Sequence, residues 1–356
     1  MKIDILIGLG YKGGVENVVN LTAEYIASSG NQVRIIQMIW IDYSWASSMV
    51  EFHKLADSGE YEINDIEAFS ARYDELISAS YEPDIVFATS WPVTVLVARK
   101  SLKDRSAIIS WMHGSIEACS DLKLGGLDEL SRADAHLAIN RTLARQLRDS
   151  TPGEVIEVSN PVDMTRIVYS ENRQIGKLAF VGRLANEKNI PFLLNALRYA
   201  SDRWTLDVIG DSDEDGTGVK ILKEYCDQIG VSDRVTFHGW LDNPWEALRD
   251  SYALVLPSER EGSPLVAVEA FLCGMVVIST PTDGMIERII PGENGYLFPF
   301  NDTESFLKIL TFIEEGKLPP ISPASCRASM QHLEGDKPLV DMWNKVMDYY
   351  RRSRRI

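Results

Sequence analysis

The sequence contains few of the residues that build disulfide frameworks or metal sites. Its 356 residues include four cysteines and five histidines. The cysteines lie far apart, at positions 119, 226, 273 and 326, without a Cys-x-x-Cys pair or a histidine at metal-ligand spacing. This pattern favours reduced thiols over disulfides or a zinc site. We therefore expect a cytoplasmic protein without a structural metal.

Basic residues are also in deficit. The chain has 36 Lys and Arg against 52 Asp and Glu, a net charge of −16. A nucleic-acid-binding protein needs a positive face against the phosphates, so this class is not expected. The one basic cluster lies near the C-terminal end, at Arg351, Arg352, Arg354 and Arg355. It indicates either a solvated end or a weak attachment to anionic lipid, so at most peripheral contact with the inner face of the plasma membrane is expected.

Long hydrophobic runs are absent as well. No apolar run approaches the length of about 18 residues that a membrane span needs. The first fourteen residues have too short an apolar core for a signal peptide and predict a β-strand instead. With 45% hydrophobic and 25% charged residues, the composition is that of a globular chain, and the length suggests two domains of about 150 residues.

Short β-branched runs alternate with longer amphipathic stretches along the chain. In the first part, strands are expected at 3–7, 33–39, 85–89, 108–111 and 135–139, with a helix at 16–28 that stops at Gly30. In the second part, strands are expected at 178–181, 205–209, 235–237, 253–256, 276–279 and 295–298, and helices at 190–200, 218–229, 244–250, 264–273 and 303–315. This repetition predicts two doubly wound α/β domains whose parallel sheets face a central cleft at the carboxyl ends of their strands.

The polar, irregular stretch 161–175 is the expected hinge between these domains. The predicted boundaries are 1–165 for an N-terminal Rossmann-like domain and 166–335 for a C-terminal one. Residues 336–356 are expected to form a C-terminal helix that packs back on the N-terminal domain, because 339–351 is amphipathic.

The first motif is 8–16, Gly-Leu-Gly-Tyr-Lys-Gly-Gly-Val-Glu, between a predicted strand and a predicted helix. It matches the G-x-G-x-x-G fingerprint, in which backbone amides and a helix N-terminus hold a pyrophosphate. The acid that should end the second strand is not in place, because Asp42 comes late. Three interpretations stay open: a tight strand-to-helix turn, a loop facing a sugar or phosphate, and a nicotinamide site.

The second motif is a pair of glutamates, Glu261 and Glu269, with seven residues between them. Ser263 suits an N-cap, Pro264 the first helical position and Gly274 the stop, so Glu261 should precede the helix and Glu269 lie within it. Two acceptors at different depths suit a polyhydroxylated ligand, and the helix start suits its diphosphate. A solvated helix is the disfavoured alternative, because the apolar neighbours of Glu269 predict burial and a buried carboxylate needs partners.

The third motif contains two cations, Arg183 and Lys188, between a predicted strand and a predicted helix. Fixed cations beside a strand end can neutralise a diphosphate leaving group in the transition state. A surface loop is the alternative interpretation.

Together these motifs resemble the retaining GT-B glycosyltransferases of family 4, also called glycosyl transferases group 1, over nearly the whole chain. The segments that carry the resemblance are 13–16, 159–163, 182–189, 208–211, 237–240, 258–270 and 294–298. Within that family the chain most resembles the lipopolysaccharide core α-1,6-galactosyltransferases, on the segments 111–113, 133–139 and 239–245.

The resemblance implies a GT-B fold of two Rossmann-like domains, the first for the acceptor and the second for the nucleotide sugar. It implies that Arg183 and Lys188 hold the diphosphate and that Glu261 binds hydroxyls of the donor sugar. His113 matches a histidine near the reacting sugar, with a structural histidine at a strand end as the alternative. The base of the nucleotide would lie near Trp240.

The resemblance also implies a donor-binding set in which Glu269 holds the ribose and backbone amides face phosphate or sugar. The set is Gly13, Gly14, Gly182, Trp240, Ser263, Leu265, Val266 and Glu269. Many relatives have glycine where this chain has Pro264, and proline has no N–H, so one donor expected of the family is missing there.

The function implied is retaining transfer of galactose or glucose from a UDP-sugar to lipopolysaccharide or another cell-surface glycan or glycolipid. No cofactor and no metal are expected, and Asp211-Ser-Asp213 is expected to be a loop rather than a metal motif. The alternatives are an NAD-dependent oxidoreductase, a GT-B epimerase and a non-catalytic glycan-binding GT-B subunit.

Overall fold

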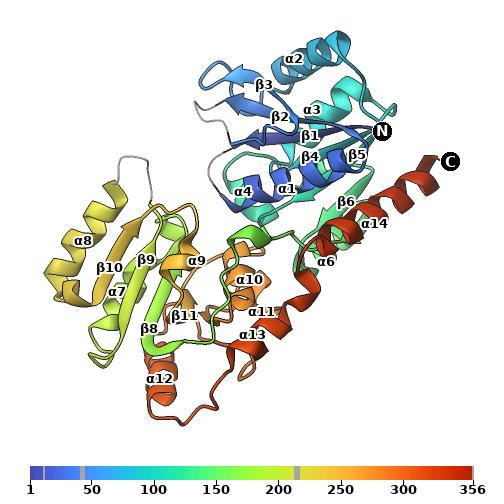
Figure 1. Ribbon diagram of the computed structural model, residues 1–356. Coiled ribbons are helices and arrows are strands. Elements are labelled where there is room, and N and C mark those ends of the chain that lie inside the picture. The colour runs from blue at the N-terminus through green and yellow to red at the C-terminus, as the bar shows by residue number, and fades with distance from the viewer. Residues whose placement is uncertain (11–12, 41–44, 212–216, 355–356) are drawn as a thin grey trace. The chain divides into compact units, whose positions relative to one another are not determined.

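A computed structural model of the chain describes residues 1–10, 13–40, 45–211 and 217–354 (Figure 1). It contains two compact units. The first consists of Met1–Val162 with Gly335–Ile356, and the second of Asp163–Glu334. Each unit has its own parallel sheet, so both units have the doubly wound architecture that the alternation of strands and helices predicts.

The described residues of the first unit form a parallel sheet of seven strands in the order β3-β2-β1-β4-β5-β6-β7. The strands are β1 (Lys2–Leu9), β2 (Gln32–Trp40), β3 (Glu51–Asp57), β4 (Ile85–Thr89), β5 (Ala107–Met112), β6 (Ala135–Ala138) and β7 (Glu154–Glu157). The helices are α1 (Gly14–Ser28), α2 (Ile66–Ala79), α3 (Val93–Leu102), α4 (Ile116–Asp121), α5 (Leu127–Leu130), α6 (Arg141–Ser150) and α14 (Lys337–Arg354). The direction of winding reverses between β1 and β4, and ligands of doubly wound folds bind at the carboxyl ends of strands at such a point.

The described residues of the second unit form a parallel sheet of six strands in the order β10-β9-β8-β11-β12-β13. The strands are β8 (Gln174–Val181), β9 (Thr205–Ile209), β10 (Val235–Gly239), β11 (Ser251–Leu256), β12 (Val276–Ser279) and β13 (Gly295–Leu297). The helices are α7 (Ile190–Leu197), α8 (Thr217–Ile229), α9 (Pro244–Ala247), α10 (Leu265–Leu272), α11 (Asp283–Ile286), α12 (Thr303–Glu314) and α13 (Pro323–Ser329). Short 3-10 turns occupy Met164–Arg166, Asn186–Lys188, Ser232–Arg234 and Gln331–Leu333. Here the winding reverses between β8 and β11.

A buried ion pair joins two neighbouring strands of the first unit. The guanidinium of Arg34 on β2 donates to both carboxylate oxygens of Asp4 on β1, at 2.9 and 2.7 Å, and both side chains are 0% exposed. The phenol of Tyr73 on α2 donates to the same carboxylate at 2.7 Å. Arg34 also donates to the backbone oxygen of Tyr81 at 3.1 Å. These hydrogen bonds connect β1, β2 and α2 inside the core.

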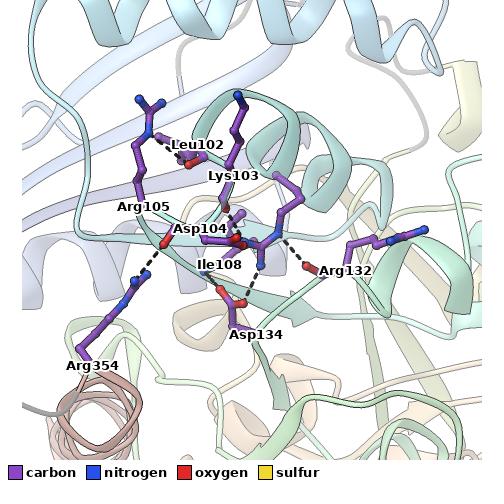
Figure 2. A network of polar contacts seen from close by, with 9 residues as sticks. Leu102, Lys103, Asp104, Arg105, Ile108, Arg132, Asp134 and Arg354 are labelled. Carbon is purple, nitrogen blue, oxygen red and sulfur yellow. Dashed lines mark hydrogen bonds and ion pairs between the residues drawn. The ribbon is translucent and has the colours of Figure 1, made fainter.

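The basic cluster at the C-terminal end lies on α14, within the first unit. Arg354 donates to the backbone oxygen of Asp104 at 2.9 Å, in the network of Figure 2. Arg352 pairs with Glu154 at 2.7 Å, and Arg351 lies 3.7 Å from Asp348. These three arginines therefore have partners within the protein, while Arg355 lies outside the described residues. Within the described part of the chain, none of the helices combines the length and the apolar character needed to cross a membrane.

Candidate functional site

Several site residues predicted in the second unit follow the carboxyl ends of parallel strands. Gly182 and Arg183 come directly after β8, and Trp240 directly after β10. Glu261 follows β11 in the loop that leads to α10. Because the strands are parallel, these segments lie at the same edge of the sheet. The segments after β8 and β11 flank the reversal point, and Trp240 follows the outermost strand β10, two strands from β8.

Two glycines allow β8 and β9 to approach each other at that edge. The φ angle of Gly210 is 133°, and a Cβ added there would lie 1.9 Å from the backbone oxygen of Gly182. Only glycine fits this position. The close approach is held by Gly182 N donating to Ile209 O at 3.0 Å and by Leu184 N donating to Asp211 O at 3.1 Å. The backbone of Arg183 is thus fixed on both sides.

Lys188 and Glu261 meet although the chain separates them by 73 residues. The Lys188 ammonium lies 2.6 Å from Oε1 of Glu261, and the Ser258 hydroxyl donates to the same oxygen at 2.9 Å. The two charged side chains are 21% and 9% exposed, so solvent screens their pairing only in part. The structure therefore brings together the predicted diphosphate-binding lysine and the predicted sugar-binding glutamate.

Arg183 is more open than Lys188. Its side chain is 56% exposed, and it lies 3.5 Å from the carboxylate of Glu187. An exposed guanidinium with a loose partner can move to an anionic ligand at small cost, because an exposed ion pair contributes little stability.

Helix α10 begins one residue later than the sequence predicts. Pro264, not Ser263, is the N-cap, because its ψ of 113° is extended and not helical. The Ser263 hydroxyl accepts from Arg288 at 2.7 Å instead of capping the helix. The expectation of Ser263 as N-cap is therefore wrong. The first N–H groups of the helix, at Leu265 and Val266, have no partner within the helix and remain suited to an anion.

Glu269 is buried within α10, as its apolar neighbours predict. Its side chain is 8% exposed, and Oε2 accepts from the indole N–H of Trp245 at 3.1 Å. Nη1 of Arg166 lies 3.9 Å from Oε1. Burial raises the pKa of the Glu269 carboxyl, although the Arg166 charge and the Trp245 hydrogen bond oppose the rise. Trp245 and Arg166 thus supply the partners that a buried carboxylate needs.

Trp240 presents an apolar surface beside this edge. It is 43% exposed, which is unusual for a tryptophan, and it follows Gly239, whose φ angle is 69°. The neighbouring His238 contacts Asp207 through Nε2 at 2.7 Å. An exposed ring of this kind can stack on a planar base.

The glycine-rich motif of the first unit packs against its own protein. A Cβ at Gly8 would lie 2.1 Å from the Trp91 ring, and one at Gly10 would lie 1.8 Å from Nε1 of Trp45. Tryptophans therefore fill the space that a dinucleotide would need at these two glycines, which favours the tight-turn interpretation over the nicotinamide one. Residues 11 and 12 of this motif, together with Asp42 and Asp213, lie outside the described residues.

The second half of the same motif opens helix α1. Gly13 is the N-cap in an extended conformation, and Gly14 is the first helical residue. A Cβ at Gly13 would lie 2.9 Å from Oε2 of Glu16. The pair is placed at the carboxyl end of β1, so a phosphate-facing role for Gly13 and Gly14 stays a prediction.

His113 lies just past the carboxyl end of β5. Its ring stands 4.6 Å from that of Trp111, and neither ring nitrogen has a hydrogen-bond partner among the described residues. Trp111 Nε1 and Ser90 Oγ are likewise buried and unpaired in the described structure. Burial lowers the pKa of His113 to about 3, so the ring is neutral. Unpaired buried polar groups cost about 1–3 kcal/mol each, and a hydroxyl-rich ligand would satisfy them.

Sequence reasoning missed four residues that shape these sites. Arg288, Ser258 and Arg166 contact predicted residues, and Ser90 lies beside Trp111, whose carbonyl accepts from its N–H at 3.1 Å. Ser90 has a positive φ of 67°, which is rare outside glycine. The partners of Arg288, Arg166 and Ser90 are distant along the chain, so no local pattern reveals these contacts. Ser258 lies only three residues before Glu261, within the segment 258–270, but its hydrogen bond to the glutamate was not predicted.

Comparison with known proteins identifies the class that this fold and site define. Residues 167–328 match the family model described as "Glycosyl transferases group 1". The chain therefore contains a glycosyl transferases group 1 domain and is a glycosyltransferase with the GT-B fold.

Its relatives include enzymes of surface-glycan synthesis. The chain is 28% identical over 252 residues to the lipopolysaccharide 1,6-galactosyltransferase of Escherichia coli K12, covering 67% of each chain. It superposes on the apo form of the lipopolysaccharide outer core galactosyltransferase WaaB with a TM-score of 0.78 at 21% identity, over 98% of this chain and 100% of that one. Anabaena HepE in complex with UDP-glucose gives the same TM-score at 17% identity, over 98% and 99% of the two chains. At these identities the two structures establish the fold alone.

Proposed function

We propose that this glycosyltransferase moves a hexose, galactose or glucose, from a UDP-sugar to lipopolysaccharide or another cell-surface glycan or glycolipid, with retention of anomeric configuration. The observation that carries the proposal is the pairing of Lys188 with Glu261 in front of α10. It places a cation, a hydroxyl acceptor and free helix N–H groups beside one another, which is the chemistry that a sugar diphosphate requires.

The two cations stabilise the leaving group. When the glycosidic bond breaks, negative charge grows on the diphosphate, and Lys188 and Arg183 stabilise it. Lys188 is held by Glu261, which Ser258 holds in turn, so the lysine needs little reorganisation, while the more exposed Arg183 can move toward the ligand. Leu265 and Val266 add N–H groups from the start of α10.

The two glutamates bind the two sugars of the donor, the hexose and the ribose. Glu261 accepts from hydroxyls of the hexose, and the buried Glu269 accepts from hydroxyls of the ribose. The exposed ring of Trp240 stacks on the uracil base. The similar HepE structure is a complex with UDP-glucose, which supports a uridine nucleotide.

Retention follows from reaction on the front face of the hexose. An oxygen of the departing diphosphate takes the proton of the acceptor hydroxyl, so no carboxylate base is needed. His113 lies in the first unit and is neutral, which suits a hydrogen bond to a sugar hydroxyl rather than to a phosphate. We assign it to the reacting sugar. The neutralisation of the leaving group is assigned to protein cations, without a metal.

The acceptor is assigned from the relatives. Similarity to a lipopolysaccharide 1,6-galactosyltransferase favours a membrane-bound glycan acceptor on the cytoplasmic side, reached by peripheral contact. The partners proposed are thus a nucleotide sugar and a glycan or lipid-linked acceptor.

A ligand screen tests this function. The protein is heated with UDP-galactose, UDP-glucose, GDP-mannose, ADP-glucose or NAD, and donor hydrolysis is measured in parallel. A ligand at 100 times its Kd stabilises the folded protein by about 2.7 kcal/mol, so a true donor stands out. We expect stabilisation and slow hydrolysis with a UDP-hexose, and an α-anomeric product by NMR.

Other outcomes identify the alternatives. Stabilisation by GDP-mannose alone contradicts the uridine assignment, and stabilisation by NAD favours the oxidoreductase. UDP-hexose binding without hydrolysis or transfer to any lipopolysaccharide core acceptor indicates a non-catalytic glycan-binding subunit.

A further inference from the structure

Trp245 and Glu269 form a buried contact in the second unit. The indole N–H of Trp245 donates to Oε2 of Glu269 at 3.1 Å, and the two residues are 1% and 6% exposed. A hydrogen bond to a charged acceptor in a place that excludes water is stronger than one at the surface.

The local sequence fixes the tryptophan. Trp245 lies on the short helix α9, which Asn243 caps by accepting the backbone N–H of Trp245 at 3.1 Å. Pro244 occupies the first helical position, where its preset φ is favourable. The backbone of Trp245 is thus held from two sides, and its ring is enclosed in the core.

The carboxylate is constrained in turn. Oε2 is directed by Trp245, and Oε1 lies 3.9 Å from Nη1 of Arg166. A carboxylate has about four lone-pair positions, so each oxygen keeps the capacity to accept a further hydrogen bond. Both contacts restrict the rotation of the Glu269 side chain before a ligand arrives, which lowers the entropy that binding would otherwise cost.

We propose that Trp245 is a positioning residue for the nucleotide: its indole N–H holds the Glu269 carboxylate in the orientation that accepts the ribose hydroxyls. This inference rests on the proposed function, in which Glu269 binds the ribose. Trp245 itself does not touch the ligand. Its effect reaches the nucleotide only through Glu269.

The chain contains a matched control for this contact. The indole N–H of Trp204, also 1% exposed, donates to Oε2 of Glu314 at 3.2 Å in the same unit. Trp204 precedes β9 at its amino end, and Glu314 ends α12, so neither belongs to the candidate site. The two tryptophans are equally buried and each donates to a carboxylate, although Glu314 is half-buried where Glu269 is buried. They differ in their relation to the site.

The experiment measures the Kd for plain UDP by calorimetry, together with unfolding in urea. Trp245→Phe removes the N–H and keeps an aromatic ring, and we expect it to weaken UDP binding about tenfold, because a hydrogen bond to a charged group is lost. Trp204→Phe should leave the Kd within twofold. For the donor sugar, Trp245→Phe should raise KM and leave kcat nearly unchanged, since ribose contacts differ little between ground and transition states.

A double-mutant cycle tests whether Trp245 acts through Glu269. In a Glu269→Gln background, Trp245→Phe should weaken UDP binding by less than twofold, because the carboxylate that it positions is gone. If Trp245→Phe fails to fold, β-(3-benzothienyl)alanine at position 245 replaces the N–H with sulfur and keeps the shape of the indole.

Two results would overturn the inference and leave the proposed function standing: UDP affinity unchanged on loss of the Trp245 N–H, or the same tenfold loss in the Glu269→Gln background. Equal losses with Trp245→Phe and Trp204→Phe would also overturn it, as a general effect on packing. If the wild-type protein itself does not bind UDP, the proposed function fails and the inference fails with it.

Discussion

The ammonium of Lys188 lies 2.6 Å from the carboxylate of Glu261, at the point where the winding of the second sheet reverses. The lysine follows β8 and the glutamate follows β11, two strands that are neighbours in the sheet but distant in the chain. A ligand phosphate that approaches Lys188 must therefore share it with Glu261. In the proposed function, the pair therefore couples the charge on the diphosphate to the group that accepts from the sugar.

The proposed function predicts that both cations, Lys188 and Arg183, are needed for turnover. Lys188→Ala and Arg183→Ala should each lower kcat by about 10²–10³, the effect of removing one preorganised group that stabilises developing charge. Lys177→Ala is the control, because Lys177 pairs with Asp250 and lies on β8 away from the carboxyl edge. Steady-state kinetics with a UDP-hexose give the comparison, and a double mutant as fast as the wild type would remove the leaving-group role.

The two glutamates should affect different kinetic constants. Glu261→Gln should lower kcat more than it raises the KM for the donor, because contacts to the reacting sugar can strengthen as its bond breaks. Glu269→Gln should mainly raise that KM and weaken binding of plain UDP. Since Glu269 is buried and accepts a hydrogen bond from Trp245, the folding of the Glu269→Gln variant must first be verified by circular dichroism. Loss of UDP affinity in Glu261→Gln, with affinity retained in Glu269→Gln, would reverse these roles.

Strands whose whole length is buried could be predicted from the sequence. Strands 85–89 and 276–279 agree to the residue with β4 and β12. The two strands that were missed, β3 and β7, lie at the edges of the first sheet and mix exposed with buried residues. An edge strand lacks the continuous apolar run that marks a central one, so its pattern is weak.

Site residues that belong to a sequence motif could be predicted. Contacts between residues that only the fold brings together could not. Glu261 and Glu269 stand at a spacing that is visible in the sequence. Trp245 lies 24 positions from Glu269 and belongs to a different helix, so no local pattern connects them. The start of α10 was misplaced because the preference of proline for the first helical position does not fix its ψ angle.

The buried ion pair between Asp4 and Arg34 should be important for the stability of the folded protein. Asp4→Asn leaves the Arg34 charge buried without its partner, and losing one member of a buried pair costs about 3–5 kcal/mol of unfolding free energy. Asp57→Asn removes the partner of Lys54 in a pair that is 48% and 62% exposed, and it should cost less than about 1 kcal/mol. Urea unfolding of both variants tests the contrast, and equal losses would mean that burial does not govern these pairs.

Two histidines with buried ring nitrogens should make the first unit sensitive to acid. Burial lowers the pKa of His113 to about 3 and that of His136 to about 4, against 6.5 for an unperturbed histidine. The unfolded chain therefore binds more protons than the folded one at pH values between these limits. The stabilisation is present in full above pH 6.5 and is lost as the pH falls, by up to about 1.4 kcal/mol per pH unit for each histidine.

Removing one of these histidines should make the unfolding free energy depend less on pH. Between about pH 6 and 4.5, His113→Asn should lower the slope of unfolding free energy against pH by up to about 1.4 kcal/mol per unit. The control is Ile109→Val on β5, which is fully buried and should lower stability equally at every pH, because it changes packing and no titrating group. Urea unfolding at closely spaced pH values gives both slopes. A slope for His113→Asn that equals the wild-type slope would mean that folding does not lower the pKa of His113, and its ring would then be protonated in the folded protein over this pH range.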